Sequence, residues 1–202
     1  PRGVIVIEDN KPDAIKLLQV RGAPAIGVAA GYGAYLGAKA APEESFDAFY
    51  GYFSAVRDAL AASRPTAVNL FWALNRMDKK VLSMKEQPVT AIKAALKDES
   101  LAIHREDIAQ NKAISEYGLS LLKPGDGLLT HCNAGPIATS QYGTALGPIL
   151  LGQEKGYNLE MAYNLIYTGG LQIITLQDPR VQATLDKIFT NDANFPRTNN
   201  AV

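Results

Sequence analysis

Gly127-Leu128-Leu129-Thr130-His131-Cys132-Asn133-Ala134-Gly135 joins a short apolar run to the only cysteine of the chain, and a helix-like pattern follows it. This order predicts a strand over residues 127–131, a turn at Cys132 and a helix over residues 137–155. Ligands of open α/β sheets bind at the carboxyl ends of the strands, and a helix N-terminus favours the thiolate form of a cysteine. Cys132 is therefore a candidate functional thiol. The alternative is a small buried hydrophobic residue, which is the usual role of a lone cysteine.

The chain before this stretch has the pattern of a helical region. Apolar residues recur at spacings of three and four from Phe46 to Leu60, which is typical of an amphipathic helix. Residues 24–40 are rich in Gly and Ala, as in a helix that its neighbours approach closely. A turn sequence, Lys123-Pro124-Gly125-Asp126, ends the region. The expected helices cover residues 11–19, 24–40, 46–60, 67–77, 88–96 and 101–122.

The chain after the cysteine alternates between helix and strand patterns. Pro148 lies inside the helix expected over residues 137–155 and should kink it. After Gly156 the pattern passes directly into a second helix, over residues 159–168, and then into a buried strand over residues 171–176. No strand is expected between the two helices, which is unusual because each crossover helix of a parallel sheet normally leads into a strand.

These patterns together predict an α/β protein with two parts. A mainly helical N-terminal domain is expected over residues 1–120. A partial Rossmann-like parallel α/β domain is expected over residues 121–202, with its ligand site at the end of the first strand.

The composition is that of a globular protein without a strong charge. The 202 residues are 47% hydrophobic, a content that is ample for a buried core. Their formal net charge is zero. No block of Lys and Arg marks a nucleic-acid surface. The apolar stretches are too short or too rich in glycine to cross a bilayer. We therefore expect neither nucleic acid nor a membrane as a partner.

Cysteine and histidine usage bears on compartment and metals. One cysteine excludes an internal disulfide and fits a reducing compartment. Residues 1–15 lack the basic start and apolar core of a signal peptide, so we expect a cytoplasmic protein. Two histidines and one cysteine, without paired spacing, predict no metal site.

Further segments carry a resemblance to a known family. They are Val20-Arg21-Gly22-Ala23-Pro24-Ala25-Ile26-Gly27, Ser63-Arg64-Pro65-Thr66-Ala67-Val68-Asn69-Leu70, Asn69–Met77 and Tyr142-Gly143-Thr144-Ala145-Leu146. Together with the segment around Cys132 they resemble the methylthioribose-1-phosphate isomerase family. That family groups with ribose-1,5-bisphosphate isomerases and with the regulatory subunits of a translation-initiation guanine-nucleotide exchange factor. The resemblance runs from about Val20 to Gly156 and favours the isomerase branch.

The resemblance implies an aldose–ketose isomerase of methionine salvage that works without a cofactor. It would convert 5-methylthioribose 1-phosphate, a small sugar phosphate, to 5-methylthioribulose 1-phosphate. The resemblance places a catalytic thiol at Cys132 and a catalytic acid/base at Asp178. The positions that it implies for substrate binding are Arg21, Gly22, Ala23 and Arg64, the last as a phosphate partner.

Two of these residues have plain structural alternatives. Arg64 is otherwise a surface arginine at the start of a helix. Asp178 precedes Pro179 and is otherwise an ordinary turn residue.

The chain also departs from the family pattern. In the family a strand and a substrate-contacting loop follow the helix that ends near Gly156, and neither has a match here; beyond Arg180 no convincing match continues. The resemblance therefore describes a truncated and internally deleted chain, from which we expect little isomerase activity, because phosphate contacts act together. The unpaired edge beside residues 171–176 predicts a homodimer. The alternatives are a ribose-1,5-bisphosphate isomerase and a non-catalytic remnant that binds sugar phosphates or proteins.

Overall fold

Helices dominate the computed structural model, which describes residues 13–130 and 134–161, all within one compact unit of the chain. In chain order the elements are α1 (Asp13–Lys16), α2 (Ala23–Ala40), α3 (Phe46–Ser63), α4 (Val68–Ser83), α5 (Val89–Ser120), β1 (Gly127–Leu128), the 3-10 helix η1 (Pro136–Ala138), α6 (Gly147–Glu154) and β2 (Glu160–Met161). The helical front expected from the sequence is confirmed. No helix in these ranges combines the length and apolar character needed to cross a bilayer.

Helix α2 lies at the centre of the helical region and packs against α3, α4 and α5. Its glycines leave room for these neighbours. A Cβ added at Gly31 would lie 3.1 Å from Ile103 Cδ1 of α5, and one added at Gly27 would lie 3.2 Å from the Asn69 carbonyl oxygen of α4. The Gly- and Ala-rich sequence therefore forms the tightly packed helix that it predicts.

The apolar stripe of α3 forms the other side of the core. Ser45 begins this helix, because its hydroxyl accepts a hydrogen bond of 3.1 Å from the Ala48 N–H. Phe49 and Phe53, one turn apart, are fully buried with their ring centroids 6.1 Å apart. Burial of each ring contributes about 1.5–3 kcal/mol. These aromatic residues belong to the core, as the spacing predicts.

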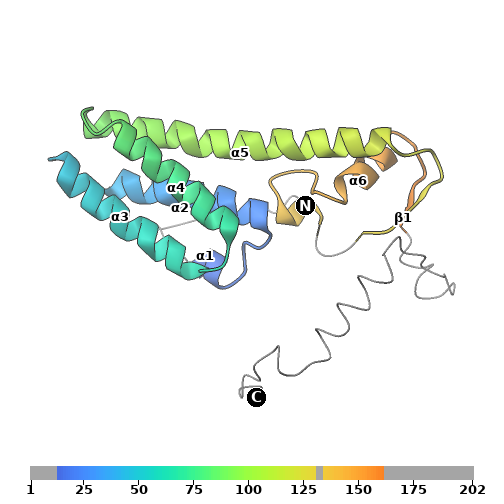
Figure 1. Ribbon diagram of the computed structural model, residues 1–202, viewed down its shortest axis with the longest axis horizontal. Helices are drawn as coiled ribbons and strands as arrows, with labels where there is room; N and C mark the ends of the chain where they lie inside the picture. The colour runs from blue at the N-terminus through green and yellow to red at the C-terminus, as the bar shows by residue number, and fades with distance from the viewer. Residues whose placement is uncertain (1–12, 131–133, 162–202) are drawn as a thin grey trace, which may run out of the picture. The chain divides into compact units, whose positions relative to one another are not determined.

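Helix α5 corrects the prediction of two helices over residues 88–96 and 101–122. The structure has one continuous helix of 32 residues, about 48 Å long at a rise of 1.5 Å per residue. The residues between the two predicted helices, Lys97 to Ser100, include no glycine or proline. The buried Ser100 hydroxyl donates to the Lys97 carbonyl oxygen at 2.8 Å, so that it is paired without a break in the helix. Figure 1 shows α5 running beside α2 and α4 and continuing to α6.

The helix expected over residues 137–155 is also corrected. Only η1 and α6 are helical, and the chain between them is a loop. Tyr142 and Gly143 have φ values of +66° and +89°, which no right-handed helix contains. Pro148 does not kink a helix. It lies in the first turn of α6, where the N–H that proline lacks is not needed.

A strand follows α6, which corrects the helix expected to begin at residue 159. β1 and β2 pair in parallel, with Gly127 opposite Glu160 and Leu128 opposite Met161. Gly156, at φ +74°, turns the chain after α6, and the buried Leu159 returns against Gly152 of that helix. The β1–α6–β2 order is the crossover that a parallel pair requires. The rest of that expected helix and the strand expected over residues 171–176 lie outside the described residues.

Candidate functional site

A cavity of about 750 Å³ lies where the start of α2 meets the segment before α6. We call it the Arg21 cavity. One wall is the turn into α2, and the other is the wall loop, which we define as residues 134–146. The lining residues are Arg21, Gly22, Ala23, Pro24, Ala134, Gly135, Pro136, Ile137, Ala138, Thr139, Thr144, Ala145 and Leu146. Two segments far apart in the sequence therefore form one concave site.

Gly22 allows these two walls to meet. Its φ is +97°, a conformation that glycine adopts readily and other residues rarely do. A Cβ at this position would lie 2.5 Å from the Cα of Ala138, closer than two carbon atoms approach without overlap. The Gly22 carbonyl oxygen accepts the first hydrogen bond of α2, from the Ile26 N–H at 3.0 Å. Gly22 thus turns the chain into α2 and leaves room for Ala138 of the opposite wall.

Hydrogen bonds within the wall loop fix its shape. The carbonyl oxygen of Ala134 accepts from the Thr144 N–H at 2.9 Å and from the Leu146 N–H at 3.3 Å. The Gly143 N–H donates to the Thr139 hydroxyl at 3.1 Å. A side chain at Gly143 would overlap the backbone of Ala134 and Gly135. The loop therefore folds back on itself into a compact wall.

The α2 wall of the Arg21 cavity combines a helix N-terminus with a cationic side chain. Ala23 and Pro24 are the first residues of α2, whose N-terminus has neither a side-chain cap nor an acidic residue in its first turn. The free N–H groups and the dipole of an N-terminus attract anions, and the exposed Arg21 adds a full positive charge beside them. The chemistry of this wall suits a phosphate group.

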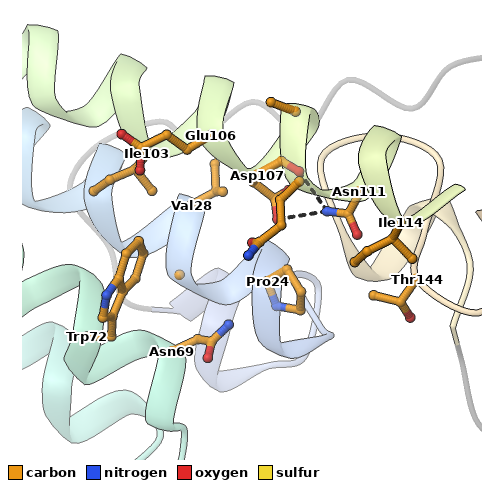
Figure 2. A pocket seen from close by; sticks show the side chains of 13 residues that line it. Pro24, Val28, Asn69, Trp72, Ile103, Glu106, Asp107, Asn111, Ile114 and Thr144 are labelled. Carbon is orange, nitrogen blue, oxygen red and sulfur yellow. Dashed lines mark hydrogen bonds between the residues drawn. The ribbon is translucent and has the colours of Figure 1, made fainter. Parts of the chain in front are cut away.

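A second cavity, of about 580 Å³, adjoins the first and shares Pro24 and Thr144 with it. We call it the Trp72 cavity (Figure 2). Its lining residues come from α2, α4, α5 and the wall loop: Pro24, Gly27, Val28, Asn69, Trp72, Ile103, Glu106, Asp107, Ala109, Gln110, Asn111, Ile114 and Thr144. This lining combines apolar side chains with two carboxylates and several amides.

Arg76 organises the α4 side of the Trp72 cavity. Its guanidinium lies 5.6 Å from the centre of the Trp72 ring and donates through both Nη atoms to the Glu106 carboxylate, with Nη2 to Oε1 at 2.8 Å. It also donates to Glu99 at 2.6 Å. The hydrogen bonds from Arg76 lower the pKa of Glu106, and those to Glu106 raise the pKa of Arg76. Glu106 is therefore a paired carboxylate.

The structure brings together three of the residues expected at the substrate, Arg21, Gly22 and Ala23. Arg64 lies elsewhere: it is the half-buried residue that ends α3, and it lines neither cavity. Cys132 and Asp178 lie outside the described residues. Ala134, two residues after Cys132 in the sequence, lines the Arg21 cavity.

The sequence patterns pointed to no role for Thr139, Thr144 or Asp107. Thr139 and Thr144 line the Arg21 cavity, and Asp107 binds the wall loop from α5. The Gly143-Thr144 pair was the available signal, since a glycine beside small polar residues is typical of a tight turn. For Asp107 no sequence signal existed, because its partner is a backbone N–H distant in the chain.

Metal ligation has no support among residues 13–130 and 134–161. No group of three or more His, Cys, Asp and Glu side chains in these ranges is arranged to hold a metal ion.

Solved structures share this fold. A crystal structure of 5-methylthioribose 1-phosphate isomerase from Pyrococcus horikoshii OT3 superposes with a TM-score of 0.70 at 35% identity, over 88% of this chain and 54% of that one. The delta subunit of translation initiation factor eIF-2B from A. fulgidus superposes with a TM-score of 0.69 at 32% identity, over 93% of this chain and 60% of that one. The chain thus resembles both an enzyme and a translation-factor subunit.

Curated relatives carry isomerase names. A methylthioribose-1-phosphate isomerase from Symbiobacterium thermophilum is 56% identical over 149 residues, 74% of this chain and 42% of that protein. A 5-deoxyribose 1-phosphate isomerase from Petrotoga mobilis is also 56% identical over 149 residues, 74% of this chain and 43% of that protein. The chain therefore spans about two fifths of the length of these relatives.

The family model for the initiation factor 2 subunit family matches residues 19–161, well over half of the chain. This range includes the α2 turn, all of α3 to α6 and the wall loop. The resemblance found in the sequence motifs is confirmed, and the chain belongs to the initiation factor 2 subunit family.

Proposed function

We propose that this chain carries the sugar-phosphate site of an aldose–ketose isomerase that acts on a ribose 1-phosphate with an uncharged group at C5. The observation that carries the proposal is the Arg21 cavity, which joins the Arg21-Gly22-Ala23 turn to the wall loop. The names of two relatives, a methylthioribose-1-phosphate isomerase and a 5-deoxyribose 1-phosphate isomerase, support this substrate class. The first substrate would place the protein in methionine salvage.

The reaction moves hydrogen between neighbouring carbon atoms of the sugar. The hydrogen on C2 is transferred to C1, and the C2 hydroxyl loses its proton while the ring oxygen gains one as the ring opens. The product is a ketone at C2 that keeps its phosphate on C1. Such transfers need an acid/base pair held close to the two carbons. We assign that pair to Cys132 and Asp178, following the family resemblance.

The phosphate is assigned to the α2 wall of the cavity. Arg21 supplies a charge-assisted hydrogen bond, and the N–H groups in the first turn of α2, where Pro24 has none, supply neutral ones. Gly22 and Ala23 expose backbone to the ligand because neither has a bulky side chain. No metal or cofactor takes part in this assignment.

One phosphate fits this arrangement better than two. Arg21 is the only cationic side chain among the described residues that line the Arg21 cavity. Among its described lining residues the adjoining Trp72 cavity has no cationic side chain, and it presents Asp107 and the Arg76-paired Glu106 beside Val28, Ile103 and Ile114, a lining that offers a second phosphate no partner and accepts an apolar group. This disfavours ribose 1,5-bisphosphate as the substrate.

We also propose that the chain is divided into two domains. We place a mainly helical domain over residues 1–120 and a Rossmann-like part over residues 121–202. The parallel pairing of β1 and β2 through α6 supports the second part. The cytoplasmic location and the homodimer also stay predictions.

The test is a binding and turnover assay on the purified chain, with 5-methylthioribose 1-phosphate, 5-deoxyribose 1-phosphate and ribose 1,5-bisphosphate. We expect binding of the first two and much weaker binding of the third. Any turnover should disappear in Cys132→Ala with binding retained, and EDTA should leave it unchanged. Binding without turnover would favour the non-catalytic remnant, and absence of binding would refute the proposed function.

A further inference from the structure

Asp107 connects helix α5 to the wall loop. Its Oδ2 accepts a hydrogen bond of 2.7 Å from the backbone N–H of Ser140. Among the described residues, this is the only hydrogen bond between residues 134–146 and α2, α4 or α5; the other hydrogen bonds of the wall loop lie within it or reach Gly147 and Leu150 of α6, which follows it directly in the chain. An ionised acceptor makes a backbone N–H bond about twice as strong as a neutral one. Asp107 is thus the polar anchor of this wall.

The wall loop needs an anchor because part of it is strained. Tyr142, two residues after Ser140, has a φ of +66°. A residue other than glycine in this left-handed region costs roughly 1–2 kcal/mol, and such a conformation persists only where surrounding contacts determine it. The Asp107–Ser140 bond supplies one such contact two residues before the strained residue.

The Asp107 carboxylate is itself held in place. The side-chain amide of Asn111, one turn later on α5, donates to Asp107 Oδ1 at 3.0 Å and to the Asp107 carbonyl oxygen at 2.8 Å (Figure 2). Asn111 is only 2% exposed. Its amide therefore has a fixed orientation, and it leaves Oδ2 directed at the wall loop. Asp107 and Asn111 form a preorganised pair on a rigid helix.

We propose that Asp107 is a positioning residue for the Arg21 cavity, a proposal that rests on the proposed function. By holding the Ser140 N–H, it keeps the wall loop opposite the Arg21-Gly22-Ala23 turn at the spacing that a sugar phosphate needs. Asp107 lines the Trp72 cavity but not the Arg21 cavity, so its effect on the phosphate passes through the wall loop. Asn111 supports it.

The experiment measures two quantities on the full chain. The first is the dissociation constant of 5-methylthioribose 1-phosphate. The second is the amide hydrogen exchange of Ser140 and Gly143 by NMR. In Asp107→Ala we expect affinity to fall about tenfold, equivalent to about 1.4 kcal/mol, and both amides to exchange on the order of tenfold faster. The helices should keep their protection.

Three variants serve as controls. Asp107→Asn retains a neutral acceptor for Ser140 and should recover most of the affinity. Asp98→Ala removes an exposed carboxylate of the same helix and should change neither quantity. Ser140→Ala keeps the backbone N–H and should also change neither.

The outcomes separate this proposal from the proposed function. Unchanged affinity in Asp107→Ala, or unchanged exchange of Ser140, would overturn the positioning role while leaving the sugar-phosphate site intact. If the wild-type chain binds no sugar phosphate, the proposed function fails. The exchange of Ser140 in Asp107→Ala then decides alone whether Asp107 holds the wall loop.

Discussion

Gly22 and Ala138 pack backbone against backbone across the Arg21 cavity, so closely that a Cβ on Gly22 would lie 2.5 Å from the Ala138 Cα. One residue turns the chain into α2, and the other ends η1. Their contact is one of the places at which the helical region meets the wall loop.

Gly22→Ala should destabilise the protein by about 1–3 kcal/mol, because it adds both a positive-φ penalty and a steric overlap. Gly51→Ala is the matched control. Gly51 is exposed in α3 with nothing within 4 Å of an added Cβ, so alanine there should stabilise by about 0.5–1 kcal/mol. Urea unfolding measures both. A Gly22→Ala variant as stable as the wild type would mean that the two walls do not touch.

Arg21→Ala should weaken sugar-phosphate binding by about tenfold or more, since a charge-assisted hydrogen bond is worth roughly 1.5–3 kcal/mol. Arg64→Ala should change binding less than about threefold, a difference of under 1 kcal/mol, because Arg64 does not line the cavity. Calorimetric titration with 5-methylthioribose 1-phosphate distinguishes the two. Equal losses of affinity in the two variants would indicate that Arg64 also binds the phosphate, as the family resemblance implies.

The Arg76–Glu106 pair should make stability depend on pH. Hydrogen bonds from Arg76 lower the folded-state pKa of Glu106. The pair therefore stabilises the protein above the unfolded carboxyl pKa, about 4.3, and this contribution disappears as pH falls through the lower folded value. Glu106 is 57% exposed, so screening limits the contribution to about 1 kcal/mol or less. The free energies of unfolding of Glu106→Gln and of the wild type, measured from pH 7 to pH 3, should differ at neutral pH and become equal in acid. A constant difference across that range would exclude this linkage.

Phe53→Ala should cost about 3–5 kcal/mol, because it leaves a cavity in a fully buried site. The neighbouring Tyr52 is 41% exposed, and Tyr52→Ala should change stability by about 0.5 kcal/mol. Thermal unfolding of both variants measures the difference. Similar losses would contradict the assignment of the α3 stripe that contains Phe53 to the core.

Much of the helical region was predictable because its signals are local. The apolar spacing of α3 and the small residues of α2 both specify structure within a few turns of chain. The prediction of two helices where α5 is continuous was wrong, because a polar stretch such as Lys97 to Ser100 does not break a helix that has partners on both sides. Glu99, for example, binds Arg76 of α4.

The sequence by itself determined the family and the helical front, and its motifs named Arg21 to Ala23 as candidate residues, because these depend on local periodicity and on motifs. Only the tertiary structure decided that β2 pairs with β1, that Arg64 lies outside the Arg21 cavity and that Asp107 holds Ser140. Each of these depends on backbone groups or side chains that are distant in the sequence. Hydrogen bonds to backbone N–H groups place little constraint on residue type, so such pairings leave no readable pattern in a single sequence.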